Sequence, residues 1–188
     1  MLPTIAAVVV VMAGVIALVV VVANSSTGKE ISNALAAGDN RTYIQESIAM
    51  APTIEAQDHV GATTSFSTIL RGQVVVLDTK LAGAPPSVGT VTLKRVVGLP
   101  GETIACTHGI VTINGTPLPE PYVPSGGSTP DFAAVTIPAG HYWVMGDNRE
   151  NSLDSREFGP VARSAVIAIV NRILSPASRA GPIPFTPR

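Results

Sequence analysis

The chain has 188 residues, a formal net charge of −1 at pH 7 and one cysteine. This length accommodates one modest domain beside a terminal segment, and the near-neutral charge gives no support for nucleic-acid binding. The single cysteine, Cys106, excludes an internal disulfide, and we interpret it as a small apolar core residue.

The first predicted element is a membrane-spanning helix. Residues 5–23 carry no charge and consist mainly of Val, Ala and Ile. A helix of this length would extend roughly 28 Å, close to the thickness of about 30 Å of a bilayer core. A cleavable signal peptide has a shorter apolar stretch and a basic start, so we expect residues 1–24 to be a retained anchor.

A polar linker is expected over residues 25–41, followed by an all-β domain over 42–174. Short runs of β-branched residues alternate with Gly, Pro and Asn turns, and no long amphipathic helix pattern follows the anchor. The loops are expected at 78–88 and 120–130, and a mobile tail over 175–188. We predict strands at Thr42–Ile48, Val74–Leu77, Gly89–Val97, Gly109–Ile113, Ala133–Ile137, His141–Met145 and Ala165–Ile173.

Four segments stand out from this background. The chain is only 13% charged, yet Gly146–Arg156 is dense in charged and amide side chains. Taken alone, that segment would be a solvated turn. The second segment, Leu93–Glu102, places a lysine inside an apolar strand pattern that ends at a Gly-Leu-Pro-Gly turn. The remaining two are Ser47-Ile-Ala-Met-Ala-Pro-Thr-Ile54 and Arg71-Gly-Gln-Val-Val-Val-Leu77.

Taken in chain order, the four segments resemble the motifs of the type I signal peptidases. These are membrane-anchored Ser/Lys endopeptidases that remove signal peptides from exported proteins. The resemblance covers about residues 43–160 and implies a β domain of short, mostly antiparallel strands on the extracytoplasmic side of the membrane. Two positions depart from the family pattern: Gln73 stands in place of Asp, and Ala49 stands in place of the nucleophilic serine.

The residues themselves favour a lysine as the general base. A serine hydroxyl needs a base beside it, and His59, His108 and His141 lie in no recognisable triad context. A lysine can serve only when neutral, which burial in apolar surroundings promotes. Lys94 lies in such a strand, where alternation puts Thr92 on its own face and Arg95 on the other. Without the resemblance, Lys94 would be a lysine at a sheet edge.

The resemblance implies a role for each remaining site residue. Position 49 is the nucleophile position, and Lys94 is the general base. Ser47 and the backbone N–H of Ala49 form the oxyanion hole, and Ser152 orients the lysine amine. Asp154 and Arg156 are a paired acid and base that support the loop, and Asp147 and Arg95 form another supporting contact. The substrate pockets are lined by Met50, Ile54, Leu93 and Met145. Signal peptides and the lipid bilayer are the expected partners, with no metal, cofactor or nucleic acid.

We therefore interpret the chain as a signal peptidase I inactivated by Ala49. Retention of Lys94 favours a deliberate Ser→Ala change over a natural pseudoenzyme, because a buried lysine destabilises a fold that no longer uses it. One alternative is a non-catalytic assembly factor that binds signal-peptide-like or pilin-like segments. Another is a self-cleaving repressor, but the predicted anchor and the lack of a DNA-binding helical module argue against it.

Overall fold

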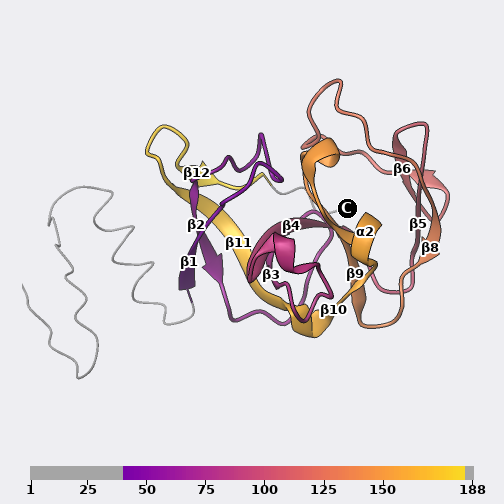
Figure 1. The fold of residues 1–188 in the computed structure, drawn as a ribbon, viewed down its shortest axis with the longest axis horizontal. Coiled ribbons are helices and arrows are strands. Elements are labelled where there is room, and N and C mark those ends of the chain that lie inside the picture. Colours follow the sequence, from indigo (N-terminus) through magenta and orange to yellow (C-terminus); the bar gives the residue numbers. More distant parts are fainter. Residues whose placement is uncertain (1–39, 185–188) are drawn as a thin grey trace, which may run out of the picture. The chain divides into compact units, whose positions relative to one another are not determined.

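Runs of β-branched residues form the strands of two sheets in the part of the chain that the structure describes, residues 40–184 (Figure 1). The structure is a computed structural model. The larger sheet has the strand order β1-β2-β11-β3-β4-β9-β10, and β12 also pairs with β11. Its strands are β1 (Asn40–Ile44), β2 (His59–Thr63), β3 (Val74–Asp78), β4 (Val91–Gly98), β9 (His141–Met145), β10 (Val161–Ala162), β11 (Val166–Ser175) and β12 (Gly181–Pro182).

The smaller sheet has the order β7-β6-β5-β8. Its strands are β5 (Thr103–Thr107), β6 (Ile110–Ile113), β7 (Thr116–Pro117) and β8 (Phe132–Thr136). The β6–β7 hairpin turns at Asn114 and Gly115, both of which have positive φ, as the tight turns favoured in hairpins require. The described helices are short: α2 (Ser155–Phe158) and the 3-10 turns η1 (Pro86–Val88), η2 (Arg149–Asn151) and η3 (Arg163–Ala165).

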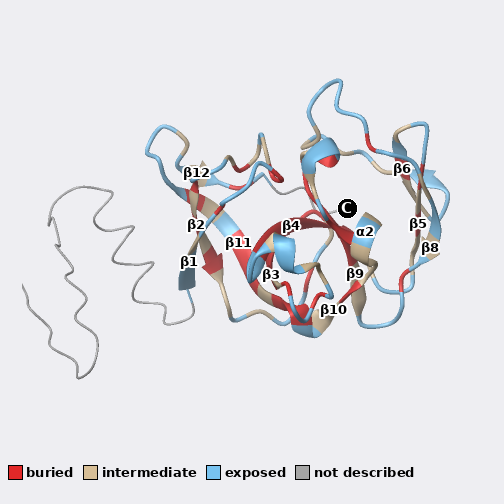
Figure 2. Ribbon diagram, viewed as in Figure 1, coloured by how far each residue is buried: buried red, intermediate tan, exposed pale blue. Residues whose placement is uncertain are grey.

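The centre of the larger sheet is buried on both faces. Val74 and Val76 of β3 pack on one side in a cluster with Met50 and Leu93. The alternating residues Val75 and Leu77 pack on the other side in a second cluster. Figure 2 shows the buried residues concentrated on β3, β4, β9 and β11. The strand that carries Lys94, β4, and the strand that precedes Gly146, β9, therefore lie in the least exposed part of the domain.

A third cluster joins the two sheets. It combines Val97 of β4 and Trp143 and Met145 of β9 with Ile104 and Cys106 of β5. Cys106 is a free, buried thiol in this cluster, as its interpretation as an apolar core residue required.

The prediction of an all-β domain is confirmed for the described residues, and the strands within them pair antiparallel. β9 has the predicted bounds. β2 and β5 were missed, because Gly and polar residues interrupt their apolar pattern. The strand predicted over Thr42–Ile48 is wrong in its second half: β1 ends at Ile44 and turns follow.

The segment after residue 174 packs more closely than the predicted mobile tail. β11 continues to Ser175, and β12 pairs with it through Ile173 and Gly181. Ile183 is buried in the same cluster as Met50. The predicted anchor, residues 5–23, lies outside the described residues. Within residues 40–184 no helix has the length and apolar character needed to cross a bilayer.

Candidate active site

Position 49 lies in a series of turns between β1 and β2. The Ala51 N–H donates to the Ile48 carbonyl at 3.0 Å, and the Ile54 N–H donates to the Met50 carbonyl at 2.9 Å. The Ala49 N–H donates to Ser47 Oγ at 3.4 Å. Ser47 and Ala49 therefore lie in turns, whereas strand alternation would have placed these two residues on one face of a strand. A turn brings the Ser47 hydroxyl beside the Ala49 amide instead.

Lys94 lies at the middle of β4, with a side chain that is buried to 2% exposure. Its Nζ donates to Thr92 Oγ1 at 3.0 Å and to the Leu93 carbonyl at 3.1 Å. The contact with Thr92 agrees with the predicted alternation along the strand. Burial lowers the pKa of Lys94 from 10.5 to about 8, against the opposing effect of the nearby Asp154 carboxylate. A substantial neutral fraction therefore exists at mildly alkaline pH.

The loop that follows β9 connects these two segments. β4 and β9 are in register at Arg95 and Met145, so Lys94 lies across from Gly146. Gly146 has no room for a side chain, because a Cβ there would overlap the Ser152 side chain and the Ala49 carbonyl. Asn148 also contacts the position-49 loop, since its backbone N–H donates to the Ala49 carbonyl at 3.1 Å. Three segments thus converge at Gly146.

We expect Gly146→Ala to destabilise the domain by about 1–3 kcal/mol and to displace the position-49 loop, because both neighbours of the added methyl are fixed by packing. Urea unfolding measures the loss of stability. Gly181→Ala is the matched control, since a Cβ at Gly181 meets nothing within 4 Å. Equal unfolding free energies for the two variants would contradict the close packing at Gly146.

Asp154 and Arg156 form the predicted ion pair at the C-terminal end of this loop. Arg156 donates from Nε and Nη2 to the two carboxylate oxygens, both at 2.8 Å. Asp154 Oδ2 also accepts from the Gly146 N–H at 3.0 Å. Burial acts to raise the pKa of Asp154, but the hydrogen bonds and charge of Arg156 hold it below its usual value. The carboxylate is therefore ionised and fixes the start of the loop.

Ser152 is close to this group but forms no hydrogen bond with the lysine amine. Its Oγ is buried and has no hydrogen-bond partner among the described residues. The resemblance implied a hydrogen bond to Lys94, whereas Lys94 Nζ bonds to Thr92 and Leu93. The orienting role of Ser152 remains a prediction.

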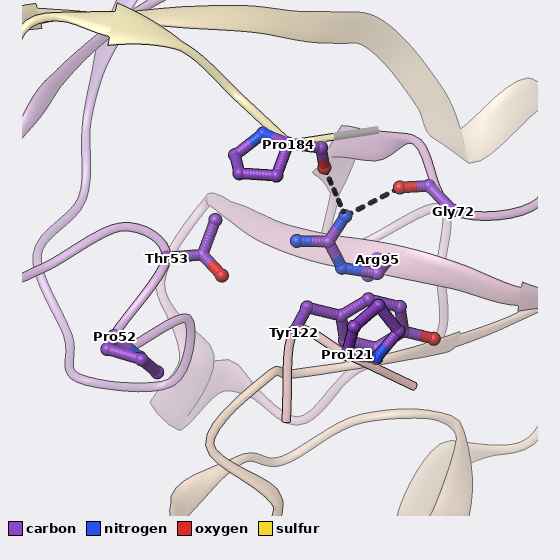
Figure 3. Close-up of a pocket in the computed structure, with 7 residues that line it drawn as sticks. All are labelled: Pro52, Thr53, Gly72, Arg95, Pro121, Tyr122 and Pro184. Carbon is purple, nitrogen blue, oxygen red and sulfur yellow. Dashed lines mark hydrogen bonds between the residues drawn. The ribbon is translucent and has the colours of Figure 1, made fainter. Parts of the chain in front are cut away.

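Arg95 and Asp147 also pair as expected. The guanidinium donates from Nε and Nη2 to the two carboxylate oxygens at 2.8 and 2.6 Å, and both side chains are buried. Arg95 Nη1 donates to the carbonyls of Gly72 and Pro184 at 2.6 and 3.3 Å (Figure 3). Such a bidentate pair holds the loop after Met145 against β4.

Two residues that no motif marks, Glu120 and Tyr122, also support this loop. Arg149 donates to both oxygens of Glu120 at 3.0 and 2.5 Å, and its Nε donates to the Gly146 carbonyl at 3.0 Å. The centroid of the Tyr122 ring lies 4.2 Å from the central carbon of the Arg95 guanidinium, and Figure 3 shows the two side chains next to each other. Both residues fall in the segment predicted as a plain loop, and no local pattern marks them.

The four residues expected to line the substrate pockets are core residues in the structure. Met50, Ile54 and Leu93 share one cluster, whereas Met145 belongs to another. All four are at most 2% exposed. They do not line the cavity of about 230 Å³ over Arg95, which is lined by Pro52, Thr53, Gly72, Arg95, Pro121, Tyr122 and Pro184 (Figure 3). Their role in substrate binding therefore remains a prediction.

The described residues offer no group of three His, Cys, Asp or Glu side chains arranged to hold a metal ion. The site offers the amine of the buried lysine, backbone amides and the hydroxyls of Ser47 and Ser152.

Residues 2–174 match the family model described as signal peptidase, peptidase S26. The chain belongs to the signal peptidase family. A signal peptidase I of Leptolyngbya laminosa is 37% identical over 153 residues, which cover 75% of this chain and 74% of that protein. Signal peptidase I T of Bacillus subtilis (strain 168) is 31% identical over 147 residues, covering 71% of this chain and 73% of the relative. The resemblance seen in the motifs is thus confirmed.

Among solved structures, a signal peptidase I from Enterococcus faecalis V583 is 32% identical to this family member. The match covers 56% of this chain and 98% of that one, with a TM-score of 0.46.

Proposed function

We propose that this signal peptidase family member derives from a membrane-bound serine endopeptidase that removes signal peptides from exported proteins. Position 49 is its nucleophile position and Lys94 its general base. The observation that carries the proposal is the burial of Lys94, whose pKa of about 8 suits a base, across from a glycine packed against Ala49. Elsewhere in a protein a buried lysine without a carboxylate bonded to it would only cost stability.

With serine at position 49, the reaction proceeds in two stages. Neutral Lys94 takes the proton of the serine hydroxyl as Oγ attacks the scissile carbonyl, and the resulting ammonium gives that proton to the leaving amine. Lys94 then takes a proton from water, which attacks the acyl-enzyme and releases the new carboxyl end while the proton returns to serine Oγ. The N–H of residue 49 and the Ser47 hydroxyl stabilise the oxyanion in each stage.

With alanine at position 49, the same groups remain but no atom can attack the carbonyl. The chain as written is then able to bind a signal peptide without cutting it. This is also the main argument for the second candidate function, a non-catalytic factor that binds signal-peptide-like or pilin-like segments. The two candidates differ in one result: whether the Ala49→Ser form cleaves.

The proposed location is the cell membrane, with one retained span over residues 5–23 and the β domain on the extracytoplasmic side. The uncharged length of that segment supports the span. Sequencing the N-terminus of the mature protein checks it. We expect the N-terminus to precede residue 5, and a new N-terminus after Ala23 would identify a cleaved leader instead.

We expect the Ala49→Ser form to cut signal-peptide substrates only after small residues. An extended substrate presents alternate side chains to the same face, so the residue before the cleaved bond and the residue two before it face the enzyme together. Large side chains there would have to displace packed atoms of Met50, Ile54 and Leu93, at a cost of about 1–3 kcal/mol or more.

A substrate series that varies one of these positions at a time measures kcat/KM, and sequencing of the product locates the cut. Substrates with Ala, Gly or Ser at both positions should be cleaved at one bond. Efficient cleavage after Lys, Phe or Leu would refute the signal-peptidase specificity. Binding of the same peptides without any cleavage would favour the non-catalytic candidate.

A further inference from the structure

The segment Ser175–Pro184 lies beyond the family match, which ends at residue 174, yet it contacts the loop that carries position 49. The link is Arg179. Its Nε donates to the two carboxylate oxygens of Asp58 at 3.2 and 2.9 Å. Its Nη2 donates to the carbonyls of Pro52 and Thr53 at 3.1 and 3.2 Å. These two carbonyls belong to the turns that directly follow Ala49.

Asp58 in turn fixes the other end of the same loop. Its Oδ2 accepts from the Glu55 N–H at 2.9 Å, and its own N–H donates to the Glu55 carbonyl at 3.1 Å. The carboxylate is 2% exposed, and the Arg179 side chain is 32% exposed. One guanidinium therefore connects the middle of the loop to its end through two different nitrogens, an arrangement that the single nitrogen of a lysine ammonium cannot reproduce.

The other end of the segment reaches the second half of the site. The Pro184 carbonyl accepts from Arg95 Nη1 (Figure 3), and Arg95 also binds Asp147 of the Gly146 loop. Ile183 is buried in the core, and its N–H donates to the Asn171 carbonyl at 3.0 Å. The segment is thus held in place by its own strand pairing and core packing, and its contacts restrict the movement of both loops.

We propose that residues 175–184 form a strap that holds the position-49 loop and the Gly146 loop in their relative positions, with Arg179 as its principal positioning residue. The proposal rests on the proposed function only for its effect on catalysis. Arg179 touches neither Lys94 nor Ala49 through any described hydrogen bond. It acts through the carbonyls of Pro52 and Thr53, three and four residues along the chain.

Amide hydrogen exchange of the chain as written tests the strap without any need for activity. The readouts are the N–H groups of Ala51 and Ile54, which are bonded within the loop. In Arg179→Ala we expect their exchange to become at least about tenfold faster, because the loop can then open locally without breaking the hydrogen bonds of the guanidinium. Arg179→Lys should give an intermediate effect.

Arg163→Ala is the matched control. Arg163 also donates to a distant backbone carbonyl, that of Phe66 at 3.2 Å, and lies 4.3 Å from the Phe66 ring, but it contacts neither loop. Exchange of Ala51 and Ile54 should be unchanged in this variant. Unchanged exchange in Arg179→Ala, or an equal acceleration in both variants, would overturn the proposal.

In the Ala49→Ser form, Arg179→Ala should lower kcat by about 10- to 100-fold, as misplacement of a nucleophile by about 1 Å does, while KM changes by less than about twofold. Arg163→Ala should leave both constants unchanged. Faster exchange with unaltered kcat would reject the catalytic role of the strap. If Ala49→Ser shows no cleavage at all, the exchange result alone decides the strap, and the proposed function fails separately.

Discussion

Serine at position 49 is expected to raise peptidase activity by at least about 10⁴-fold over the chain as written. Without a hydroxyl at this position the residual catalysis comes from binding and the oxyanion hole, and loss of the nucleophile in a serine protease costs on the order of 10⁴- to 10⁶-fold in kcat. Ser47 and the Gly146 loop pack against position 49 in the chain as written, and Lys94 is already buried. Both forms would be assayed in detergent on one signal-peptide substrate.

The control for this experiment is Ser47→Ala in each form. Ser47 Oγ accepts a hydrogen bond from the Ala49 amide and is therefore an alternative nucleophile beside position 49. If the chain as written cleaves as well as its Ala49→Ser form and loses activity with Ser47→Ala, Ser47 is the nucleophile. If only the Ala49→Ser form is active, Ser47→Ala should reduce kcat by about 10²- to 10³-fold through the oxyanion hole.

Replacement of Lys94 by methionine should abolish cleavage in the Ala49→Ser form while the domain stays folded. Methionine has nearly the length of lysine and suits a site of 2% exposure, but it can accept no proton from serine. Lys80, which is exposed, provides the control, and Lys80→Met should retain full activity. Activity of Lys94→Met near that of its parent would remove the lysine from the mechanism.

The lowered pKa also predicts a pH dependence of catalysis. Because only neutral Lys94 can act as the base, kcat/KM of the Ala49→Ser form should rise with pH and level off above about 8. The charges that act on the amine are Asp154 and Asp147, which raise its pKa, and Arg156, which lowers it. A profile that is flat between pH 7 and 9 would contradict the role of Lys94 as the titrating base.

The same shift has a consequence for stability, with a defined sign. The folded pKa of about 8 lies below the ordinary value of 10.5, so the folded state binds fewer protons between these pH values and stability should rise across that window. Below about pH 8, Lys94 is charged in both states and its full burial cost is present. The free energy of unfolding of Lys94→Met near pH 7 should therefore exceed that of its parent by about 3 kcal/mol. Urea unfolding should show that advantage shrink as the pH approaches 10.5.

The amino-acid sequence by itself determined the family, the β class and the charged residues that form two buried ion pairs beside Gly146. These features depend on local information. Apolar alternation and turn residues mark strands such as β9, and the order of short motifs marks Lys94, Asp147 and Asp154. The pairs Arg95–Asp147 and Asp154–Arg156 followed from the same motifs and are present in the structure.

Only the tertiary structure decided which distant residues hold these motifs in place. Glu120 binds Arg149 and Asp58 binds Arg179, although 29 and 121 positions separate them in the chain. No periodicity connects such residues, because their contacts depend on how loops cross after the sheets have formed. The turn that brings Ser47 to Ala49 could not be predicted for a related reason. The residues at 42–48 are compatible with a strand throughout. The strand ends at Ile44 because the following residues Met50 and Ile54 pack into the core.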